Sequence, residues 1–471
     1  MSDDLPKLKK SLGLVDLTLL LIVAIVNLNL VPAIAKAGAG VTLLWVFAFF
    51  LFFLPQAVAV VELSNRFPQE GGIYVWSKVS FGELNGFLSG WCYWANNLFY
   101  IPTLLFYFVG GALFVAGPSV LPLADNIYFM SGAAVVLLWL LVGLNVAGPV
   151  YWKWVQNIGG LGAFVLVGIL IAVSFAGDGS AGGVANQLNL ASLVPNVTDW
   201  GTVSMLGVVC FALVGFELSS VMGEEIKRPK SNIPRAVLMA GIGCILLYLA
   251  CTLALQLSVP AENIKEVTGL LQIIEAEKRF GVLPLLAFLL SLSVAGAASA
   301  WLAGSARIPF VMGIGSFLPP AFGKVHPRYH TPYVALIVEG VVMTAIILLN
   351  SVGATVKGAY AVLLKTAVVI QLIPFLYMFA ALVKVRLVPG HYSDTEPFFR
   401  SSWLCFVAGV TGFIITAIGI ILAFFPQEAS ESISSHGLKI FLGCVLFLVP
   451  ALFLYFKQAK KTQAGAESPP L

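Results

Sequence analysis

An apolar run near the N-terminus carries polar residues where a membrane-spanning helix would need none. Residues 17–40 are hydrophobic enough to cross a bilayer, yet Asn27, Asn29 and Pro32 lie in the middle of the run. Pro32 has no N–H and its ring clashes with the preceding turn, so carbonyls near Leu28 lose their partners. In hydrocarbon such groups must bond to protein, water or a ligand. The run therefore predicts a broken helix with a polar gap near the bilayer midplane.

A second apolar run shows a similar interruption. Within residues 205–222, Gly207 and Gly215 flank the centre and Glu217 follows directly. Glycines in a membrane helix can also serve only to let neighbouring helices pack closely. The two runs lie five predicted spans apart, and an inverted repeat of five spans would bring both breaks together. Two breaks at matching positions indicate a binding site more strongly than either break alone.

The composition indicates a membrane protein. Of the 471 residues, 59% are hydrophobic and only 10% are charged, whereas soluble domains carry about 25% charged residues. The net charge of +4 comes from short basic loops and does not indicate nucleic-acid binding. All six cysteines lie in apolar runs without a CxxC pair, so neither a metal site nor a disulfide framework is predicted. The expected fold class is an all-α polytopic membrane protein.

Hydropathy predicts twelve transmembrane helices. Their expected ranges are 14–37, 42–64, 85–116, 127–148, 155–176, 200–222, 233–257, 281–306, 332–350, 355–382, 402–425 and 437–456.

The distribution of lysine and arginine sets the expected orientation. Nineteen of the 26 basic residues fall on the side of the N-terminus and five on the opposite side. By the positive-inside rule, both termini are expected in the cytoplasm of a multi-pass protein of the plasma (inner) membrane. The segment 259–280 alternates acidic and basic residues and is expected to form an amphipathic helix at the outer surface.

Three passages resemble the amino acid–polyamine–organocation permeases, and the likeness extends over essentially the whole chain. They are residues 62–82 (ELSNRFPQEGGIYVWSKVSFG), residues 215–236 (GFELSSVMGEEIKRPKSNIPRA) and residues 305–332, which contain ARIPFVMGIGSFLPPAFGKVHPRYHTP. The resemblance implies a 5+5 inverted repeat with broken helices 1 and 6, plus two extra helices. It also implies transport of amino acids or related amines by alternating access, as a proton-coupled symporter or a substrate exchanger.

The implied repeat divides the chain into five parts. They are a cytoplasmic tail at 1–13, a first five-helix repeat at 14–176, a second at 200–382, helices 11 and 12 at 402–456, and a cytoplasmic tail at 457–471.

A zwitterionic amino acid needs partners for both charges when it leaves water. Backbone N–H groups at the start of the second half of span 1 suit a carboxylate, and the carbonyls at both breaks suit an ammonium. The predicted substrate contacts are therefore the backbones of Ile25, Val26, Asn27, Leu28, Phe211, Ala212, Leu213 and Val214.

Family resemblance adds three aromatic candidates and one departure. Phe211 falls where the family places an aromatic gate, although ordinary core packing explains it equally well, and Tyr93 and Trp301 are expected to face the substrate. Ile25-Val26-Asn27 replaces a Gly-Ser-Gly-like run, so the side-chain amide of Asn27 or Asn29 is expected to contribute. In this respect the chain is more similar to the glutamate–GABA antiporter branch than to the arginine–agmatine branch.

Charged residues at membrane depth cost about 2.5–3.5 kcal/mol each at a helix centre. Glu217 is expected either to titrate during transport or to latch span 6. Lys365 is expected to pair with an acidic group or a substrate carboxylate, or to form a structural ion pair with Glu339. Glu62, near a span end, is expected to reach the interface. Ala163 stands where some family members have a lysine in place of a sodium ion, and sodium coupling is less favoured.

Other classes of function fit less well. The four histidines lie in loops or at span ends, and neither GxSxG nor HExxH occurs, so we do not expect an enzyme. The absence of a P-loop disfavours an ATP-driven pump. A polyamine permease and a nutrient receptor on a transporter fold stay open. We expect no cofactor and no metal, a small-molecule substrate with protons as a further partner, and either a monomer or a weak homodimer.

Overall fold

The fold is built from helices. The computed structural model describes residues 8, 10–176, 194, 200–265, 269–276, 280–314, 317–350, 356–388, 395–426 and 432–466. Across these ranges the regular structure is helical, and one isolated β-bridge joins Leu12 to Ile226. This arrangement confirms the predicted all-α polytopic class.

The first part of the chain contains eight α-helices, one π-helical segment and one 3₁₀ segment. They are α1 (Leu14–Ile25), α2 (Val31–Ala35), α3 (Val41–Ala48), the π-helix η1 (Phe49–Phe53), α4 (Leu54–Arg66), α5 (Ile73–Phe81), α6 (Glu83–Ala116), η2 (Pro118–Asp125), α7 (Ile127–Ala147) and α8 (Pro149–Ala176).

The remaining elements follow the same pattern, with short 3₁₀ segments at turns. They are α9 (Trp200–Ala212), α10 (Leu218–Val221), η3 (Gly223–Glu225), α11 (Pro229–Ser258), η4 (Ala261–Asn263), α12 (Gly269–Ala276), η5 (Phe280–Val282), α13 (Leu283–Ser305), α14 (Arg307–Ile314), η6 (Pro320–Gly323), α15 (Tyr333–Asn350), α16 (Val356–Leu387), α17 (Ser402–Leu422) and α18 (Ile433–Ala466).

Each predicted span overlaps one or more of these helices. Within the described ranges, nine helical runs are long and apolar enough to cross a bilayer, and three shorter apolar helices accompany them. Two of the shorter ones, α1 and α9, are first halves of the spans predicted to be broken. Twelve crossings and the inverted repeat remain predictions. The short helix α12 lies in the segment predicted to be amphipathic.

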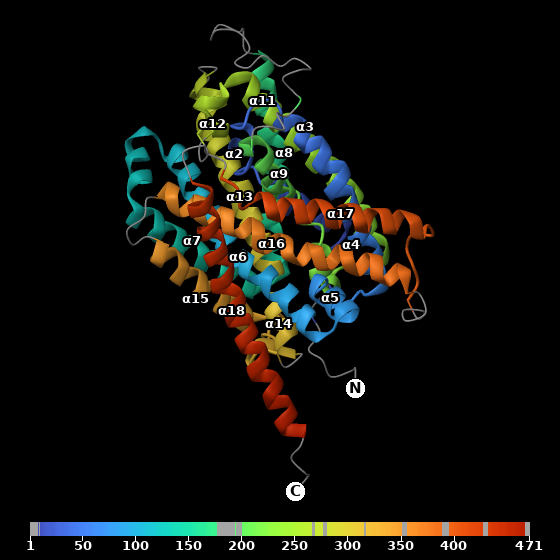
Figure 1. Cartoon of the computed structure of the whole chain (residues 1–471). Coiled ribbons are helices and arrows are strands. Elements are labelled where there is room, and N and C mark those ends of the chain that lie inside the picture. Colours follow the sequence, from blue (N-terminus) through green and yellow to red (C-terminus); the bar gives the residue numbers. More distant parts are fainter. Residues whose placement is uncertain are drawn as a thin grey trace.

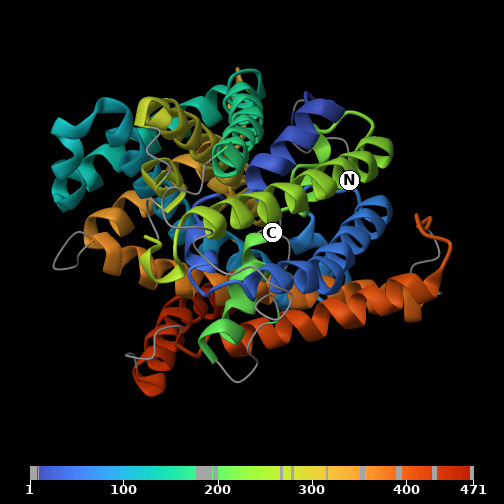
Figure 2. The same ribbon diagram turned by 90° about the horizontal axis from the view of Figure 1, so that it is seen from above.

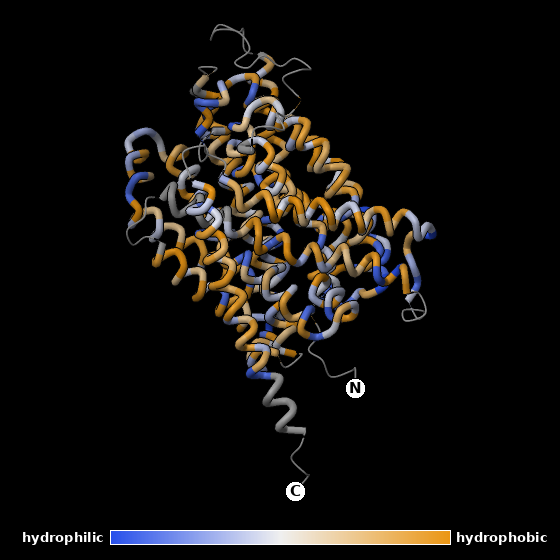
Figure 3. The backbone as a smooth tube through the Cα atoms, viewed as in Figure 1, coloured by the Kyte–Doolittle hydropathy of each residue, from blue (hydrophilic) through white to orange (hydrophobic). Residues whose placement is uncertain are grey.

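Burial separates inner from outer helices. The runs containing α6 and α13 are 78% buried in their apolar windows, whereas that of α18 is 17% buried. α6 packs on α13 and α16, and α13 also packs on α8. Figures 1 and 2 show α16 and α17 side by side along one side of the bundle. Apolar residues dominate the helices, and many of the hydrophilic ones lie where helices end or are connected (Figure 3). The outer helices thus turn apolar faces outward, as lipid requires.

Two of the helical runs are interrupted, and their breaks position the candidate site. The first separates α1 from α2 at residues 26–30, and the second separates α9 from α10 at residues 213–217. Pro32 lies in the first turn of α2, where a missing N–H is tolerated. Gly215 adopts a φ of +145°, a conformation that side chains disfavour. The predicted breaks in spans 1 and 6 are therefore present.

Candidate functional site

The hydroxyl of Tyr248 ties the two breaks together. Tyr248 lies on α11, is fully buried, and accepts a hydrogen bond from the backbone N–H of Asn27 at 2.8 Å. The same hydroxyl oxygen is 2.5 Å from the carbonyl oxygen of Ile25 and 2.8 Å from that of Ala212. A phenolic hydroxyl has one hydrogen, so it can donate fully to only one carbonyl at a time. The ring stacks on Trp45 with centroids 4.2 Å apart, which fixes its position.

The side chain of Asn27 makes a second connection between the breaks. Its Nδ2 donates to the Ala212 carbonyl at 3.5 Å, and its Oδ1 accepts from the Tyr100 hydroxyl. A buried amide needs such partners, because leaving it unpaired costs free energy. The amide predicted to contribute to the site therefore lies between the two breaks. Asn29 lies in the same break and is buried.

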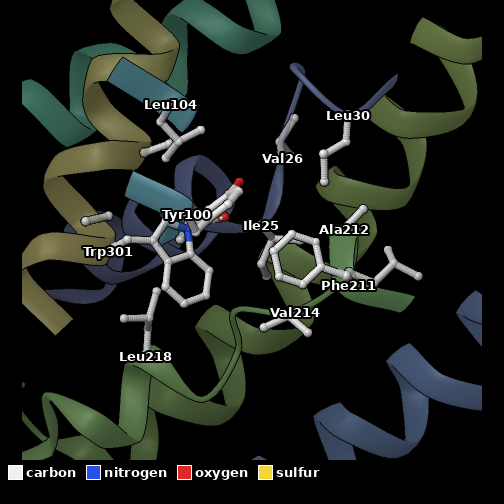
Figure 4. Packing of buried hydrophobic residues seen from close by; sticks show 14 of the residues in the cluster. Ile25, Val26, Leu30, Tyr100, Leu104, Phe211, Ala212, Val214, Leu218 and Trp301 are labelled. Carbon is white, nitrogen blue, oxygen red and sulfur yellow. Dashed lines mark hydrogen bonds between the residues drawn. The ribbon is translucent and has the colours of Figure 1, made fainter. Parts of the chain in front are cut away.

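Gly215 marks the closest approach of the two breaks. A β-carbon at Gly215 would lie 2.6 Å from Cγ1 of Ile25, closer than real β-carbons approach other atoms. Figure 4 shows Ile25, at the end of α1, close to Val214 in the second break. Only glycine combines this contact with the observed φ, so Gly215 lets the chain pass directly beside the end of α1.

Aromatic side chains surround the contact between the two breaks, residues 26–30 and 213–217, which we call the joint. The ring of Tyr100 packs edge-on against Phe211 and Trp301, with centroid distances of 5.2 and 6.0 Å. The Trp301 indole donates to the Ala24 carbonyl at 3.0 Å, and Tyr93 lies 6.3 Å from the Trp301 ring. Figure 4 shows Tyr100, Phe211 and Trp301 arriving from three different elements around Ile25. The joint is thus lined by ring faces and edges that can contact an organic substrate.

Glu217 joins the second break to two neighbouring helices. Its Oε2 accepts from the Gly215 backbone N–H at 2.9 Å and from Nε2 of Gln56 at 3.2 Å. Its Oε1 accepts from the hydroxyl of Tyr93 at 3.2 Å, and the side chain is fully buried. Among the described residues no cation pairs with this carboxyl group. Glu217 can therefore both hold the break in place and bind a proton.

The carbonyls at the breaks are less accessible than the sequence predicted. Ile25 and Ala212 were expected to offer bare carbonyls, but the Tyr248 hydroxyl lies within hydrogen-bond distance of both and donates to one of them at a time, and Ala212 also accepts from Asn27. The physical reason is that a buried carbonyl without a partner is costly, so a nearby hydroxyl satisfies it. Each carbonyl oxygen has two lone pairs, and that of Ile25 also accepts from the Asn27 N–H at 2.8 Å, so a further donor must displace one of its present partners.

All eleven predicted substrate-contact residues lie at or beside the two breaks, and each is at most 3% exposed. They are Ile25, Val26, Asn27, Leu28, Asn29, Tyr93, Phe211, Ala212, Leu213, Val214 and Trp301.

The coupling candidate Lys365 lies in α16, but its side chain is outside the part of the chain that the structure describes. Its pairing with an acidic group remains a prediction. Glu339, one proposed partner, is fully buried and accepts a hydrogen bond from Ser305.

Sequence reasoning missed Tyr248 and Gln56. Tyr248 places a hydroxyl group in the otherwise apolar middle of span 7, and Gln56 places an amide group in span 2. A polar group at membrane depth costs free energy unless it has a hydrogen-bond partner. An isolated polar residue in an apolar span therefore indicates a buried contact, and this was the signal that could have identified Tyr248 and Gln56. The partners themselves, Asn27 and Glu217, are far away in sequence.

Glu62 is buried rather than at the interface as predicted. It is fully buried and forms ion pairs with Arg66 at 2.6 Å and Arg386 at 3.0 Å. Its second oxygen accepts from the backbone N–H groups of Phe398 and Phe399, each at 3.0 Å. Two cations and two N–H donors replace water around the carboxylate, so it need not reach the surface.

A second buried charge cluster lies at the same end of the bundle. Arg307 donates to Glu225 from Nη2 at 2.5 Å, and its Nε lies 3.8 Å from Oε1 of Glu70. Burial, and then the charge of Glu225, raises the pKa of Glu70 well above its usual value. Two carboxyl groups share one guanidinium, and a protonated Glu70 lowers their mutual repulsion.

Replacing Tyr248 with phenylalanine is expected to destabilise the protein. The change removes the buried hydroxyl that accepts from the Asn27 N–H and donates to the Ile25 or Ala212 carbonyl, and each such hydrogen bond contributes about 0.5–1.5 kcal/mol. Thermal unfolding of the purified protein in detergent should show a lower midpoint. The matched control is Tyr128→Phe, since Tyr128 is 80% exposed, and it should unfold like wild type. Equal midpoints for Tyr248→Phe and Tyr128→Phe would contradict the tie between the breaks.

Comparisons of the sequence with a family model and with single proteins both identify permeases and transporters as its relatives. Residues 12–455 match the protein family described as amino acid permease. The chain is 27% identical to an uncharacterized transporter of Legionella pneumophila, covering 94% of this chain and 97% of that one. It is 23% identical to a probable agmatine/putrescine antiporter of Lactococcus lactis, covering 90% and 92%. It is 25% identical to a branched-chain amino acid permease of Bacillus subtilis, covering 70% and 72%.

Proposed function

The chain belongs to the amino acid permease family and is a multi-pass secondary transporter of amino acids or amines, and we propose that it binds its substrate between its two broken helices. The observation that carries this proposal is the joint between the breaks, where Tyr248 and Asn27 connect α1 with α9. Alternating access then consists of opening this joint to one side of the membrane and then to the other.

The substrate ammonium binds at the carbonyl end of the joint. The Tyr248 hydroxyl hydrogen can serve either Ile25 or Ala212, so an incoming ammonium takes the carbonyl that the hydroxyl leaves. The carboxylate binds backbone N–H groups of the segment that follows α1, where the N–H groups of Asn27, Leu28 and Leu30 must first give up their present bonds to backbone carbonyls. This segment leads into α2, which has only five residues, so the N–H groups rather than a long helix dipole supply the attraction.

The aromatic residues close the site. Phe211 and Trp301 each pack on Tyr100 near Ile25, and the substrate contacts are almost fully buried in this conformation (Figure 4). A substrate therefore enters only when the rings separate. Movement of Phe211, which lies just before the second break, would open the joint with little change elsewhere.

Glu217 couples protonation to the second break. Its buried carboxyl group holds Gly215 directly, and no cation neutralises it among the described residues. Gaining or losing a proton changes the strength of that hold. Lys365 is proposed as a second coupling residue. Sodium coupling is less favoured than proton coupling or exchange, and Ala163 stands where some family members have a lysine in place of a sodium ion.

The remaining proposals concern placement and assembly. Both termini are cytoplasmic, the membrane is the plasma (inner) membrane, and the protein is a monomer or a weak homodimer. Two inverted repeats, 14–176 and 200–382, surround the site. The chain carries no enzymatic activity in this proposal, and membership of the glutamate–GABA antiporter branch stays a prediction.

A ligand screen followed by transport tests the proposal. Ligands that bind only the folded state raise the unfolding midpoint, so purified protein is screened against amino acids and polyamines. We expect an amino acid to give the largest shift and to be taken up or exchanged by proteoliposomes. A shift with polyamines alone would favour the alternative of a polyamine permease. Binding without uptake or exchange would favour a nutrient receptor and overturn the transport proposal.

A further inference from the structure

A groove on the outside of the bundle leads to the second break. It has a volume of about 530 Å³ and is lined almost entirely by apolar atoms from η1, α4, α11 and the segment around Phe398. α4 and α11 pack on one another along it and lie next to each other in Figure 2. Its volume falls within the range of roughly 300–1,000 Å³ that is typical of small-molecule sites.

The inner wall of the groove is Phe216, which belongs to the break itself. Phe216 is 1% exposed and stacks on Phe53 with ring centroids 4.4 Å apart. Gly241 on α11 leaves space for this ring, because a β-carbon there would lie 3.2 Å from Cζ of Phe216. Phe216 stands between Gly215 and Glu217 in sequence. Whatever fills the groove therefore presses on the residue at the centre of the broken span.

One end of the groove is fixed by buried charges. Phe398 and Phe399 line it, and the Glu62 carboxylate holds the backbone N–H groups of both. Arg66 and Arg386 pair with Glu62, so the cluster of these three side chains carries a net positive charge. These hydrogen bonds and ion pairs therefore hold the backbone at one edge of the groove in place.

The same end presents exposed positive charge. Arg235 lines the groove and is exposed, and Arg400, also exposed, directly follows Phe399 in sequence. Glu396, exposed on the same segment, is the one described carboxylate there besides Glu62. An apolar channel that ends at exposed arginines matches a molecule with a long hydrocarbon tail and an anionic head.

We propose that this groove binds an anionic phospholipid, with one acyl chain along η1, α4 and α11 and its phosphate at Arg235. Because the protein spans the membrane, this outer surface is in contact with lipid acyl chains, and phospholipids are present around it at high concentration. The bound chain packs against Phe53 beside Phe216 and stabilises the closed form of the second break. Lipid composition then regulates the transporter through a site separate from the substrate site.

Native mass spectrometry tests the proposal without knowledge of the substrate. Protein is purified in detergent micelles that contain equal amounts of phosphatidylcholine and phosphatidylglycerol, and the lipid molecules that stay bound are counted. Arg235→Gln should retain about fivefold less phosphatidylglycerol, the factor that one surface cation contributes. Leu238→Trp should fill the groove and reduce retention of the same lipid, since Leu238 lines it and is 66% exposed.

Matched controls separate a site from general lipid contact. Lys230→Gln removes an exposed cation outside the groove, and Met239→Trp adds the same bulk at an exposed α11 position that does not line it. Both controls should retain wild-type amounts of phosphatidylglycerol. Phosphatidylglycerol should also raise the unfolding midpoint of wild type more than that of Leu238→Trp. Wild-type retention by Arg235→Gln and Leu238→Trp, or equal loss in the controls, would overturn the proposal.

Discussion

Replacing Gly215 with alanine is expected to reduce substrate binding and uptake at least about tenfold, which corresponds to 1.4 kcal/mol. The new β-carbon would lie 2.6 Å from Cγ1 of Ile25, and a φ of +145° is strained for alanine by about 1–3 kcal/mol. The two breaks must move apart, and the tie through Tyr248 and Asn27 is lost with them. Uptake of the substrate found in the ligand screen, measured in proteoliposomes, checks this expectation.

The matched control is Gly168→Ala in α8. A β-carbon at Gly168 meets no atom within 4 Å, and alanine favours a helix by up to about 1 kcal/mol over glycine. Gly168→Ala should therefore transport like wild type and unfold at the same or a higher temperature. If Gly215→Ala binds and transports like Gly168→Ala, the two breaks are not in the tight contact described here.

Replacing Glu217 should separate its structural role from its role in coupling. Glutamine can keep its oxygen toward the Gly215 N–H and Gln56, while its amide group faces the Tyr93 hydroxyl, which can also accept. Glu217→Gln should therefore fold, yet its uptake should no longer change with pH, because glutamine does not titrate. The measurement is initial uptake in proteoliposomes between pH 5 and pH 8, roughly the range where maximal stability tends to lie.

Glu217→Ala supplies the structural comparison. Alanine leaves three buried donors unpaired at about 1–3 kcal/mol each, a large part of the roughly 5–15 kcal/mol that holds a protein folded. We expect this variant to unfold at a much lower temperature than Glu217→Gln. A folded Glu217→Gln protein with the pH profile of wild type would limit Glu217 to holding the break and contradict its role in coupling.

The two breaks could be predicted from the sequence because their causes are local. Asn27 and Pro32 interrupt one apolar run, and Gly215 followed by Glu217 interrupts another. A proline without an N–H and a glycine with positive φ act on their own turn of the chain, so their effect does not depend on the rest of the fold. The spans were predictable for a similar reason, since the bilayer sets their length and polarity.

The contacts that hold the breaks together could not be predicted, because they join distant parts of the chain. Tyr248 meets Asn27 across 221 residues, and Gln56 meets Glu217 across 161. For the same reason Glu62 was expected at the interface, although Arg386 lies beside it in the fold.

Helix ends show the limit of hydropathy. The fifth span was predicted from residue 155, but α8 begins at Pro149. Its first turns contain Lys153, which lowers the hydropathy before residue 155. In the fold Lys153 pairs with Asp16 of α1 at 3.7 Å, and Asp16 also accepts from Asn157 at 2.9 Å, so the fold tolerates these polar side chains.

A cryo-EM structure with the tightest-binding amino acid or amine would show whether the substrate lies between the two broken helices. We expect ligand density between the two breaks, with its ammonium within hydrogen-bond distance of the Ile25 or Ala212 carbonyl and its body against Phe211 or Trp301. Density for the ligand elsewhere, with the joint between the breaks closed and unchanged, would contradict the account.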